Sequence, residues 1–133
     1  MGVSLSAKAR AFLERPVYAH VATLMKDGSP QVTPVWVETD GQDLLINSSE
    51  PRLKVRNMQR DGRVALSMIG LDNPQQGLFV RGIVKEITAE GANDQINRLS
   101  VKYTGNPEYQ GFREGEQRMT IRIEPIRVLE RRL

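Results

Sequence analysis

Cysteine is absent from this chain of 133 residues, and histidine occurs once, at His20. The lack of thiols excludes a disulfide framework, thiolate metal ligation and thiol catalysis. A single imidazole argues against a histidine-rich metal centre and against Ser-His-Asp chemistry, and neither GxSxG nor HExxH occurs. We therefore expect no metal site, and motifs assign no catalytic residue.

Long apolar runs and a secretory leader are also missing. No segment approaches the roughly 20 apolar residues that cross a bilayer, and the start, MGVSLSAK, lacks a basic region followed by an apolar run. Together with the absence of cysteine, this favours a cytoplasmic protein without a membrane segment. The length is typical of one domain, so residues 1–133 are expected to form a single domain.

Aromatic residues make up only 5% of the chain, and the formal net charge is +3. The basic residues are not interleaved with aromatics as in a protein that binds single-stranded nucleic acid, so no nucleic-acid partner is expected. The glycine patterns GxGxxG and GxxxxGK[ST] are missing too. Their absence argues against nucleotide binding of the Rossmann or P-loop type.

What the sequence does contain is a series of short β-type segments separated by tight turns. Asp27-Gly28 and Asp40-Gly41 supply the turn chemistry. Connections this short join antiparallel neighbours, because a parallel crossover needs many more residues. Alternation of side-chain type is clearest in residues 78–88. The expected strands are residues 17–25, 31–39, 44–47, 63–69, 78–88 and 119–124.

Three helices are expected beside these strands. Ser4 or Ser6 caps a first helix that runs to about Glu14. A serine cap and the early Pro51 favour a second helix that reaches Arg60, and residues 89–103 form an amphipathic third. Many short strands with a few covering helices predict a mainly β (α+β) domain whose antiparallel sheet closes into a barrel.

The most informative segment is NSSEPRLKVRN, residues 47–57. The start of a helix offers free N–H donors and a partial positive charge, so the Ser48 and Ser49 hydroxyls could surround one phosphate together with Arg52 and Lys54. The same pattern also fits Ser49 as a simple helix cap, with the basic side chains on a solvated face. The residues alone leave both interpretations open.

His20 and Trp36 are the remaining candidates for a functional role. His20 lies within an apolar strand, where a packed or interface position is commoner than proton donation. Trp36 fits stacking on a cofactor ring, but a strand aromatic more often anchors a core or an interface. Neither residue is assigned a role from the sequence.

Four segments, in this order, resemble the pyridoxamine 5'-phosphate oxidase-like split β-barrel flavin-binding proteins: AHVATL (19–24), DGSPQVTPVW (27–36), LLINS (44–48) and RLKVRNM (52–58). The pattern EPRxKxRN at 50–57, followed by DGRVA at 61–65, is similar to the short branch of that family that uses the deazaflavin coenzyme F420. The resemblance covers nearly the whole chain. It implies an FMN-binding type of split barrel and a homodimer with cofactor sites in grooves between the subunits.

The resemblance also implies which residues contact the cofactor. The second strand would line the tricyclic ring, the end of the third strand would lie near the ribityl chain, and the basic segment would hold the phosphate. Two glutamines of the 70–77 loop would reach the cofactor from the partner subunit. The implied cofactor-binding residues are Val32, Thr33, Pro34, Val35, Asn47, Ser48, Ser49, Arg52, Lys54, Asn57, Gln75 and Gln76.

The activity implied by the resemblance is an oxidoreductase reaction that uses F420. Reduced deazaflavin would transfer hydride to an electron-poor small molecule such as an enone, a quinone or a tetrapyrrole, while the protein positions both. Vitamin B6 chemistry is not expected, because the substrate-binding C-terminal region of pyridoxamine phosphate oxidases has no counterpart here. An FMN-dependent oxidoreductase of the same fold and a non-catalytic cofactor- or ligand-binding protein are the alternatives.

Overall fold

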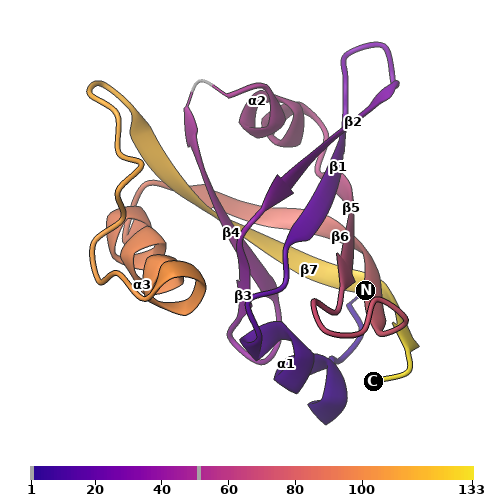
Figure 1. Ribbon diagram of the computed structural model, residues 1–133. Helices are drawn as coiled ribbons and strands as arrows, with labels where there is room; N and C mark the ends of the chain where they lie inside the picture. Colours follow the sequence, from indigo (N-terminus) through magenta and orange to yellow (C-terminus); the bar gives the residue numbers. More distant parts are fainter. Residues whose placement is uncertain (1, 51) are drawn as a thin grey trace.

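The computed structural model describes residues 2–50 and 52–133, which fold into seven strands and three helices (Figure 1). All strand pairs are antiparallel, and the strand order is β2-β1-β5-β6-β7-β4-β3. In chain order the elements are α1 (Ala7–Glu14), β1 (Ala19–Leu24), β2 (Pro30–Val35), β3 (Val37–Thr39), β4 (Leu44–Glu50), α2 (Leu53–Arg60), β5 (Arg63–Ile69), β6 (Gly77–Thr88), α3 (Ala92–Thr104) and β7 (Gln117–Arg131). This confirms the predicted mainly β, split-barrel architecture.

The sheet curls into a half-open barrel around its two longest strands. β6 and β7 pair over most of their length, and their register shifts between Arg81 and Gly82 and again between Val84 and Glu86. At Gly82 a Cβ atom would come within 2.6 Å of the Ile123 Cγ2 atom, so only glycine fits this close approach. Such irregularities bend a strand and increase its twist, which allows the sheet to close.

Alternating side chains of the strands point into the barrel and form its core. The first helix closes one end of it: the Ser6 hydroxyl accepts a hydrogen bond from the Ala9 N–H group, and Ala9, Phe12 and Leu13 are buried. The predicted cap at Ser6 is therefore confirmed. The two other helices cover further openings of the barrel (Figure 1).

Several predicted element boundaries are wrong. The continuous strand expected over 31–39 is two strands, β2 and β3, that flank Trp36. The third predicted strand does not end at Asn47, because β4 continues to Glu50 through pairing with β7. Ser49 is consequently a strand residue, and Arg52 is the N-cap of α2. Pro51, expected to start this helix, lies outside the described residues. The closing strand is also longer than 119–124, spanning Gln117–Arg131.

The third helix lies against the sheet beside β4 and β7. It follows Gly91 and ends before Gly105, and both glycines have the left-handed backbone conformation that favours this residue (φ 73° and 80°). Ile96 and Leu99, which belong to this helix, are buried against the sheet. None of the helices in the described ranges is long and apolar enough to cross a membrane.

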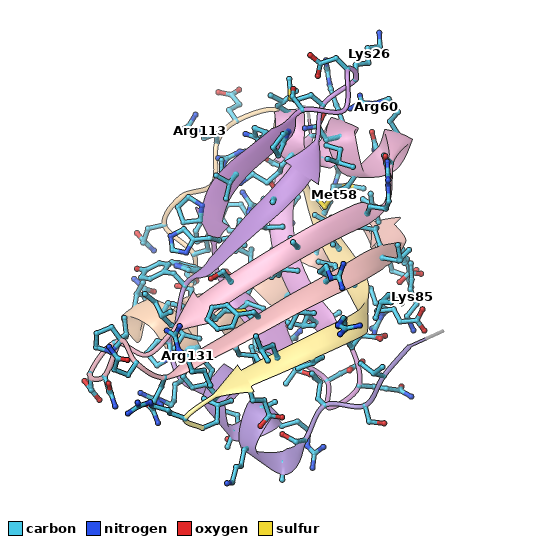
Figure 2. The ribbon with its side chains drawn as sticks, turned by 90° about the vertical axis from the view of Figure 1, so that its right-hand side faces the viewer. Lys26, Met58, Arg60, Lys85, Arg113 and Arg131 are labelled. Carbon is cyan, nitrogen blue, oxygen red and sulfur yellow. The ribbon has the colours of Figure 1, made fainter. Side chains whose placement is uncertain are left out.

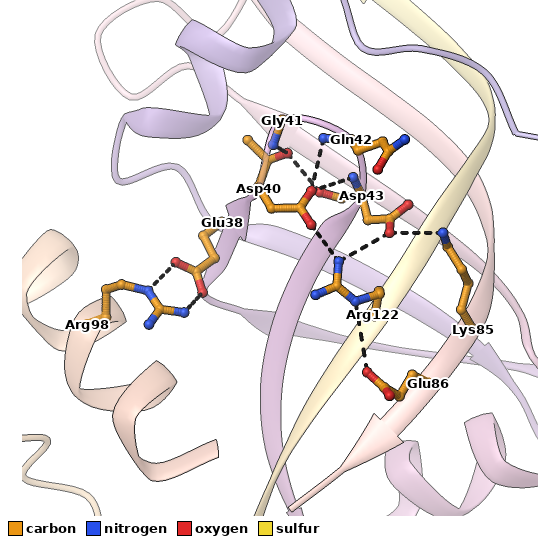
Figure 3. A network of polar contacts seen from close by, with 10 residues as sticks. Glu38, Asp40, Gly41, Gln42, Asp43, Lys85, Glu86, Arg98 and Arg122 are labelled. Carbon is orange, nitrogen blue, oxygen red and sulfur yellow. Dashed lines mark hydrogen bonds and ion pairs between the residues drawn. The ribbon is translucent and has the colours of Figure 1, made fainter. Parts of the chain in front are cut away.

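A network of charged side chains ties the β3–β4 turn to β6 and β7 (Figure 3). The buried Asp43 carboxylate pairs with Lys85 at 3.0 Å and with Arg122 at 3.2 Å. Arg122 also bonds Asp40 and lies 3.9 Å from Glu86. Burial raises the pKa of Asp40, but hydrogen bonds from the Asp43 N–H group and Arg122 outweigh it and lower that pKa to about 2. Every cation in this network faces a carboxylate.

Candidate functional site

A cavity of about 180 Å³ opens where β4 ends and α2 begins. We call it the cationic cavity. It brings together residues of β2, β4, α2, α3 and β7 that are far apart in the sequence. Its lining residues are Tyr18, Pro34, Val35, Trp36, Asn47, Ser48, Arg52, Lys54, Ile96, Tyr109 and Arg118. Six of the predicted cofactor-binding residues are among them: Pro34, Val35, Asn47, Ser48, Arg52 and Lys54.

Positive charge in the cationic cavity exceeds negative charge. Lys54 and Arg118 are buried, with 7% and 5% of their surfaces exposed, and Arg52 lies at the opening. One carboxylate, that of Glu116, approaches Arg118, with an Nη1–Oε1 distance of 3.4 Å. Within residues 2–50 and 52–133, Lys54 has neither an ion pair nor a side-chain hydrogen bond. Burial, followed by the charges of Arg52 and Arg118, lowers the pKa of Lys54 below its usual 10.5.

The position of Lys54 follows from the way α2 packs on the barrel. Val55 and Met58 are buried in the core, so this face of the helix is fixed against the sheet. The Asn57 side chain donates hydrogen bonds to the Thr23 hydroxyl at 3.1 Å and to the Met25 sulfur at 3.4 Å. Asn57 thus fixes the helix to β1. The first turn of α2, which carries Lys54, has no side-chain cap, and the Val55 N–H group donates to the Arg52 carbonyl at 3.1 Å. Within the described chain the Leu53 and Lys54 N–H groups have no acceptor, so these two could bind an anion.

A chain of hydrogen bonds holds Arg118 in place. The Arg118 Nε atom donates to the Asn47 side-chain oxygen at 2.9 Å. The Asn47 amide nitrogen in turn donates to the Ala92 carbonyl at 2.9 Å and to the Gln95 side-chain oxygen at 2.8 Å. Thr120 donates to the same Gln95 oxygen at 2.7 Å. The guanidinium is therefore positioned before any ligand arrives, which reduces the entropy lost on binding.

A buried hydroxyl in the cationic cavity has no partner. Among the described residues, the Ser48 Oγ atom is buried without a hydrogen bond. An unsatisfied buried polar group costs about 1–3 kcal/mol, so such groups are uncommon and invite a functional explanation. A ligand oxygen in the cavity would satisfy this hydroxyl. Ser49, the next residue of β4, is not among the residues that line the cavity.

Aromatic rings form one wall of the cationic cavity. The Trp36 and Tyr103 rings stack with centroids 5.0 Å apart and an interplanar angle of 5°. The Tyr109 ring meets Trp36 edge-on at 5.8 Å, and the Arg118 guanidinium lies 5.1 Å from the Tyr109 ring centre. Tyr103 is fixed from behind, since its hydroxyl donates to the Val17 carbonyl and accepts from the Val37 N–H group. This wall offers a flat apolar surface beside the positive charges.

The other predicted site residues lie outside the cavity lining. Val32 is exposed on the same face of β2 as Pro34 but does not line the cavity, and the Thr33 hydroxyl is buried without a partner in the described chain. Gln75 and Gln76 lie in the β5–β6 loop, where Gln76 accepts a hydrogen bond from Arg15 and donates one to the Arg132 carbonyl. Their contact with a cofactor stays a prediction.

Sequence reasoning missed Tyr109 and Arg118. Tyr109 lies in the irregular segment after α3, and Arg118 lies near the start of β7. No motif marks either residue. Only the register in which Ser49 faces Arg118 brings the start of β7 to the basic segment. Described His, Cys, Asp and Glu side chains do not gather in threes as a metal centre requires.

A curled antiparallel barrel with a basic cavity at its strand–helix junction defines this protein as a split-barrel protein. Residues 5–132 match the family model of pyridoxamine 5'-phosphate oxidase. The chain belongs to the pyridoxamine 5'-phosphate oxidase family.

Solved structures agree with this assignment. An F420 reductase is 32% identical, with a TM-score of 0.83, and the match covers 94% of this chain and 98% of that one. HupZ from Group A Streptococcus (18% identity, TM-score 0.69, 95% and 93% covered) and HutZ, the heme storage protein from Vibrio cholerae (14%, 0.68, 97% and 96%), share the fold. No functionally curated sequence matches the chain.

Proposed function

We propose that this protein is an oxidoreductase that uses the deazaflavin F420 to reduce an electron-poor small molecule. The observation that carries the proposal is the unbalanced charge of the cationic cavity, where Lys54, Arg118 and Arg52 gather and, among the described residues, one carboxylate, that of Glu116, pairs with Arg118. The similarity to an F420 reductase over almost the full length supports it. When bound and reduced, F420 supplies the hydride for an enone, quinone or tetrapyrrole acceptor.

The residues of the cationic cavity fit the phosphate of this cofactor. Lys54 and Arg52 provide charge, the first turn of α2 provides N–H donors, and the Ser48 hydroxyl provides the hydrogen bond that it otherwise lacks. Asn47 orients Arg118 toward the same space. Binding an anion here would remove the imbalance of charge that burial makes costly.

The ring system would lie along β2, next to the cavity. Pro34 and Val35 line the cavity, and Val32 and Thr33 precede them on the same strand. In this arrangement the chain contributes binding and orientation, and orientation alone can lower a barrier by several kcal/mol. Ser49 and Asn57 would act indirectly, through the placement of β4 and α2.

A homodimer in the cytoplasm is part of the proposal. Ile69 and Leu71 are exposed apolar residues at the start of the loop that carries Gln75 and Gln76. An apolar contact of this loop with a second subunit would bring the two glutamines to the partner's cofactor. Light scattering after size exclusion tests this, and a monomer at micromolar concentration would contradict it.

FMN is the alternative cofactor, because an excess of cations also suits the doubly charged phosphate of FMN. Fluorescence titration with F420 and FMN in parallel distinguishes the two, and we expect tighter binding of F420.

Lys54→Ala should weaken F420 binding about tenfold or more, the scale of one lost charge-assisted contact. Lys26→Ala, at an exposed turn, is the matched control. Equal F420 affinity in wild type and Lys54→Ala would refute the assignment of Lys54.

Turnover separates an enzyme from a binding protein. Reduced F420 should be consumed when the protein is offered a panel of enones, quinones and biliverdin. Stoichiometric binding of F420 with no oxidation across the panel would instead support the non-catalytic alternative.

A further inference from the structure

The carboxylate beside the cationic cavity is paired loosely. Both side chains of the Glu116–Arg118 pair are buried, with 9% and 5% of their surfaces exposed. The two Glu116 oxygens nevertheless lie 3.4 and 3.5 Å from the Arg118 Nη1 atom. In the more exposed pair of Arg98 with Glu38, the two contacts measure 3.0 and 2.8 Å (Figure 3). Charge-assisted hydrogen bonds are normally about 2.7–2.9 Å long, so the contact of Glu116 offsets little of the cost of burying both charges.

Glu116 is not needed to orient the arginine. The Arg118 Nε atom donates to Asn47, and the guanidinium lies against the Tyr109 ring, so two other contacts already hold it. In the described chain the Arg118 Nη2 atom has no hydrogen bond, which leaves it able to donate to a ligand. Arg118 lines the cavity and Glu116 does not. Glu116 therefore takes up no space in the cavity and acts on its contents through charge.

A short turn places the Glu116 carboxylate at the end of the connection between α3 and β7. The Glu116 N–H group donates to the Arg113 carbonyl, and the Glu116 carboxylate accepts from the Arg113 N–H group, both at 3.2 Å. Gly115, within the turn, has the left-handed backbone conformation that favours glycine (φ 80°). Figure 2 shows the Arg113 side chain at the periphery of the molecule. An exposed turn thus holds a carboxylate at a defined place beside the cavity.

We propose that Glu116 is an internal counter-ion that determines how much negative charge the cationic cavity accepts. An anion bonded to Arg118 comes close to the Glu116 carboxylate, and the repulsion between the two grows in proportion to the charge of the anion. Glu116 therefore weakens the binding of a doubly charged phosphate monoester more than that of a singly charged phosphate diester.

This dependence on charge bears on the choice of cofactor, a step that rests on the proposed function. FMN carries a phosphate monoester, whose second pKa is about 6, so its phosphate is close to doubly charged at neutral pH. The phosphate of F420 is a diester with a single charge, and the carboxylates of F420 lie further along its side chain. Glu116 thus favours F420 over FMN, although both phosphates suit the cations of the cavity.

Two small phosphates and one isosteric variant test the counter-ion directly. Glu116→Gln removes the charge and keeps an oxygen that accepts from the Arg113 N–H group. At about pH 7.5 phenyl phosphate is a dianion and methyl phenyl phosphate a monoanion. By calorimetry we expect the variant to bind the dianion about tenfold more tightly than wild type does, and the monoanion about threefold more tightly, because half the charge gives half the repulsion energy.

Glu114→Gln is the matched control, since it changes the net charge equally at an exposed position of the same turn. Because solvent and salt screen an exposed charge, this variant should change each affinity by less than about twofold. Thermal unfolding checks that both variants fold.

Four outcomes would overturn the proposal. Weaker binding of both phosphates to Glu116→Gln would mean that the carboxylate positions Arg118. Equal gains in Glu116→Gln and Glu114→Gln would reduce the effect to net charge. Equal gains for the two phosphates would show that ligand charge does not matter, and no binding of either phosphate to wild type or variant would mean that the cavity takes no such anion.

The cofactors themselves test the last step. The ratio of FMN affinity to F420 affinity should rise about threefold in Glu116→Gln and stay unchanged in Glu114→Gln. F420 binding with an unchanged ratio in Glu116→Gln would refute the part of Glu116 in cofactor choice. If the small phosphates respond as expected but wild type does not bind F420, the proposed function is refuted and the role of Glu116 as a counter-ion is not.

Discussion

Two charged regions of this protein differ in how their charges are balanced. Around Asp43, each cation lies against a carboxylate, and the network joins the β3–β4 turn to β6 and β7 (Figure 3). In the cationic cavity, Lys54 is buried among positive charges and its pKa is lowered, mainly because it is buried. In the region around Asp43, carboxylates of the chain itself balance the positive charges. The cationic cavity has an excess of positive charge among the described residues, which is why we propose that it is a ligand site.

The largest change in stability is expected in the network around Asp43, where the charges are balanced. Asp43→Ala would leave Lys85 and Arg122 without their buried partner and should destabilise the protein by about 2–3 kcal/mol, as when one member of a buried pair is removed. Urea unfolding measures this loss. Asp72→Ala, at an exposed loop, is the control. A loss below about 0.5 kcal/mol would show that the Asp43 network contributes little.

In the cationic cavity, removing a charge is expected to raise the stability of the protein instead of lowering it. Lys54→Met removes a buried, unpaired charge and keeps the apolar stem, so the unliganded protein should gain about 1 kcal/mol of stability. Unfolding without ligand measures the gain, while F420 binding should weaken about tenfold or more in the same variant, as in Lys54→Ala. A destabilised Lys54→Met protein would mean that the charge is satisfied in the free protein, and the comparison between the two regions would fail.

The pH dependence of F420 binding and of stability also tests whether Lys54 is a buried, unpaired charge. The folded-state pKa of Lys54 lies below 10.5, mainly because of burial, so its ammonium loses its proton earlier than a free lysine. F420 affinity should therefore fall as pH rises through this lowered pKa. Between that pKa and 10.5 the unfolded chain binds more protons, so stability without ligand should rise with pH. In Lys54→Arg, which stays charged, the fall in F420 affinity should be absent. The rise in stability should be smaller but not absent, because burial also lowers the pKa of Lys102, to about 8, and this lysine contributes a rise of its own. Titrations across the alkaline range check this.

The smallest effect is expected at the unpaired hydroxyl. Ser48→Ala removes a buried group that has no partner among the described residues, so stability without ligand should rise rather than fall. F420 binding should weaken by a few-fold, because one neutral hydrogen bond is worth about 0.5–1.5 kcal/mol. Calorimetry on wild type and variant measures the affinity, and urea unfolding measures the stability. An unchanged affinity would place the phosphate away from Ser48.

Local sequence patterns predicted most of the fold. The helix cap at Ser6, the turns at Asp27-Gly28 and Asp40-Gly41, and the alternation in β6 are short-range features, and the residues themselves specify them. The ends of the strands were harder to predict from the sequence. β4 continues through two serines because β7 provides a hydrogen-bonding partner, and this partner lies some seventy residues further along the chain.

The candidate site was predictable in part for the same reason. Lys54 and Arg52 belong to one continuous segment with a recognisable pattern. Arg118 joins them only through the pairing of β4 with β7. Long-range register therefore decided which basic residues gather, and periodicity carries no information about register between distant strands.

Trp36 gives the protein a built-in reporter. It is the only tryptophan of the chain, and it lines the cationic cavity while stacked on Tyr103. Indole emission responds to changes in polarity and to nearby absorbing rings, so a coloured molecule that enters beside β2 quenches it without any label. One emission spectrum thus follows occupancy in real time, even for ligands that are never turned over.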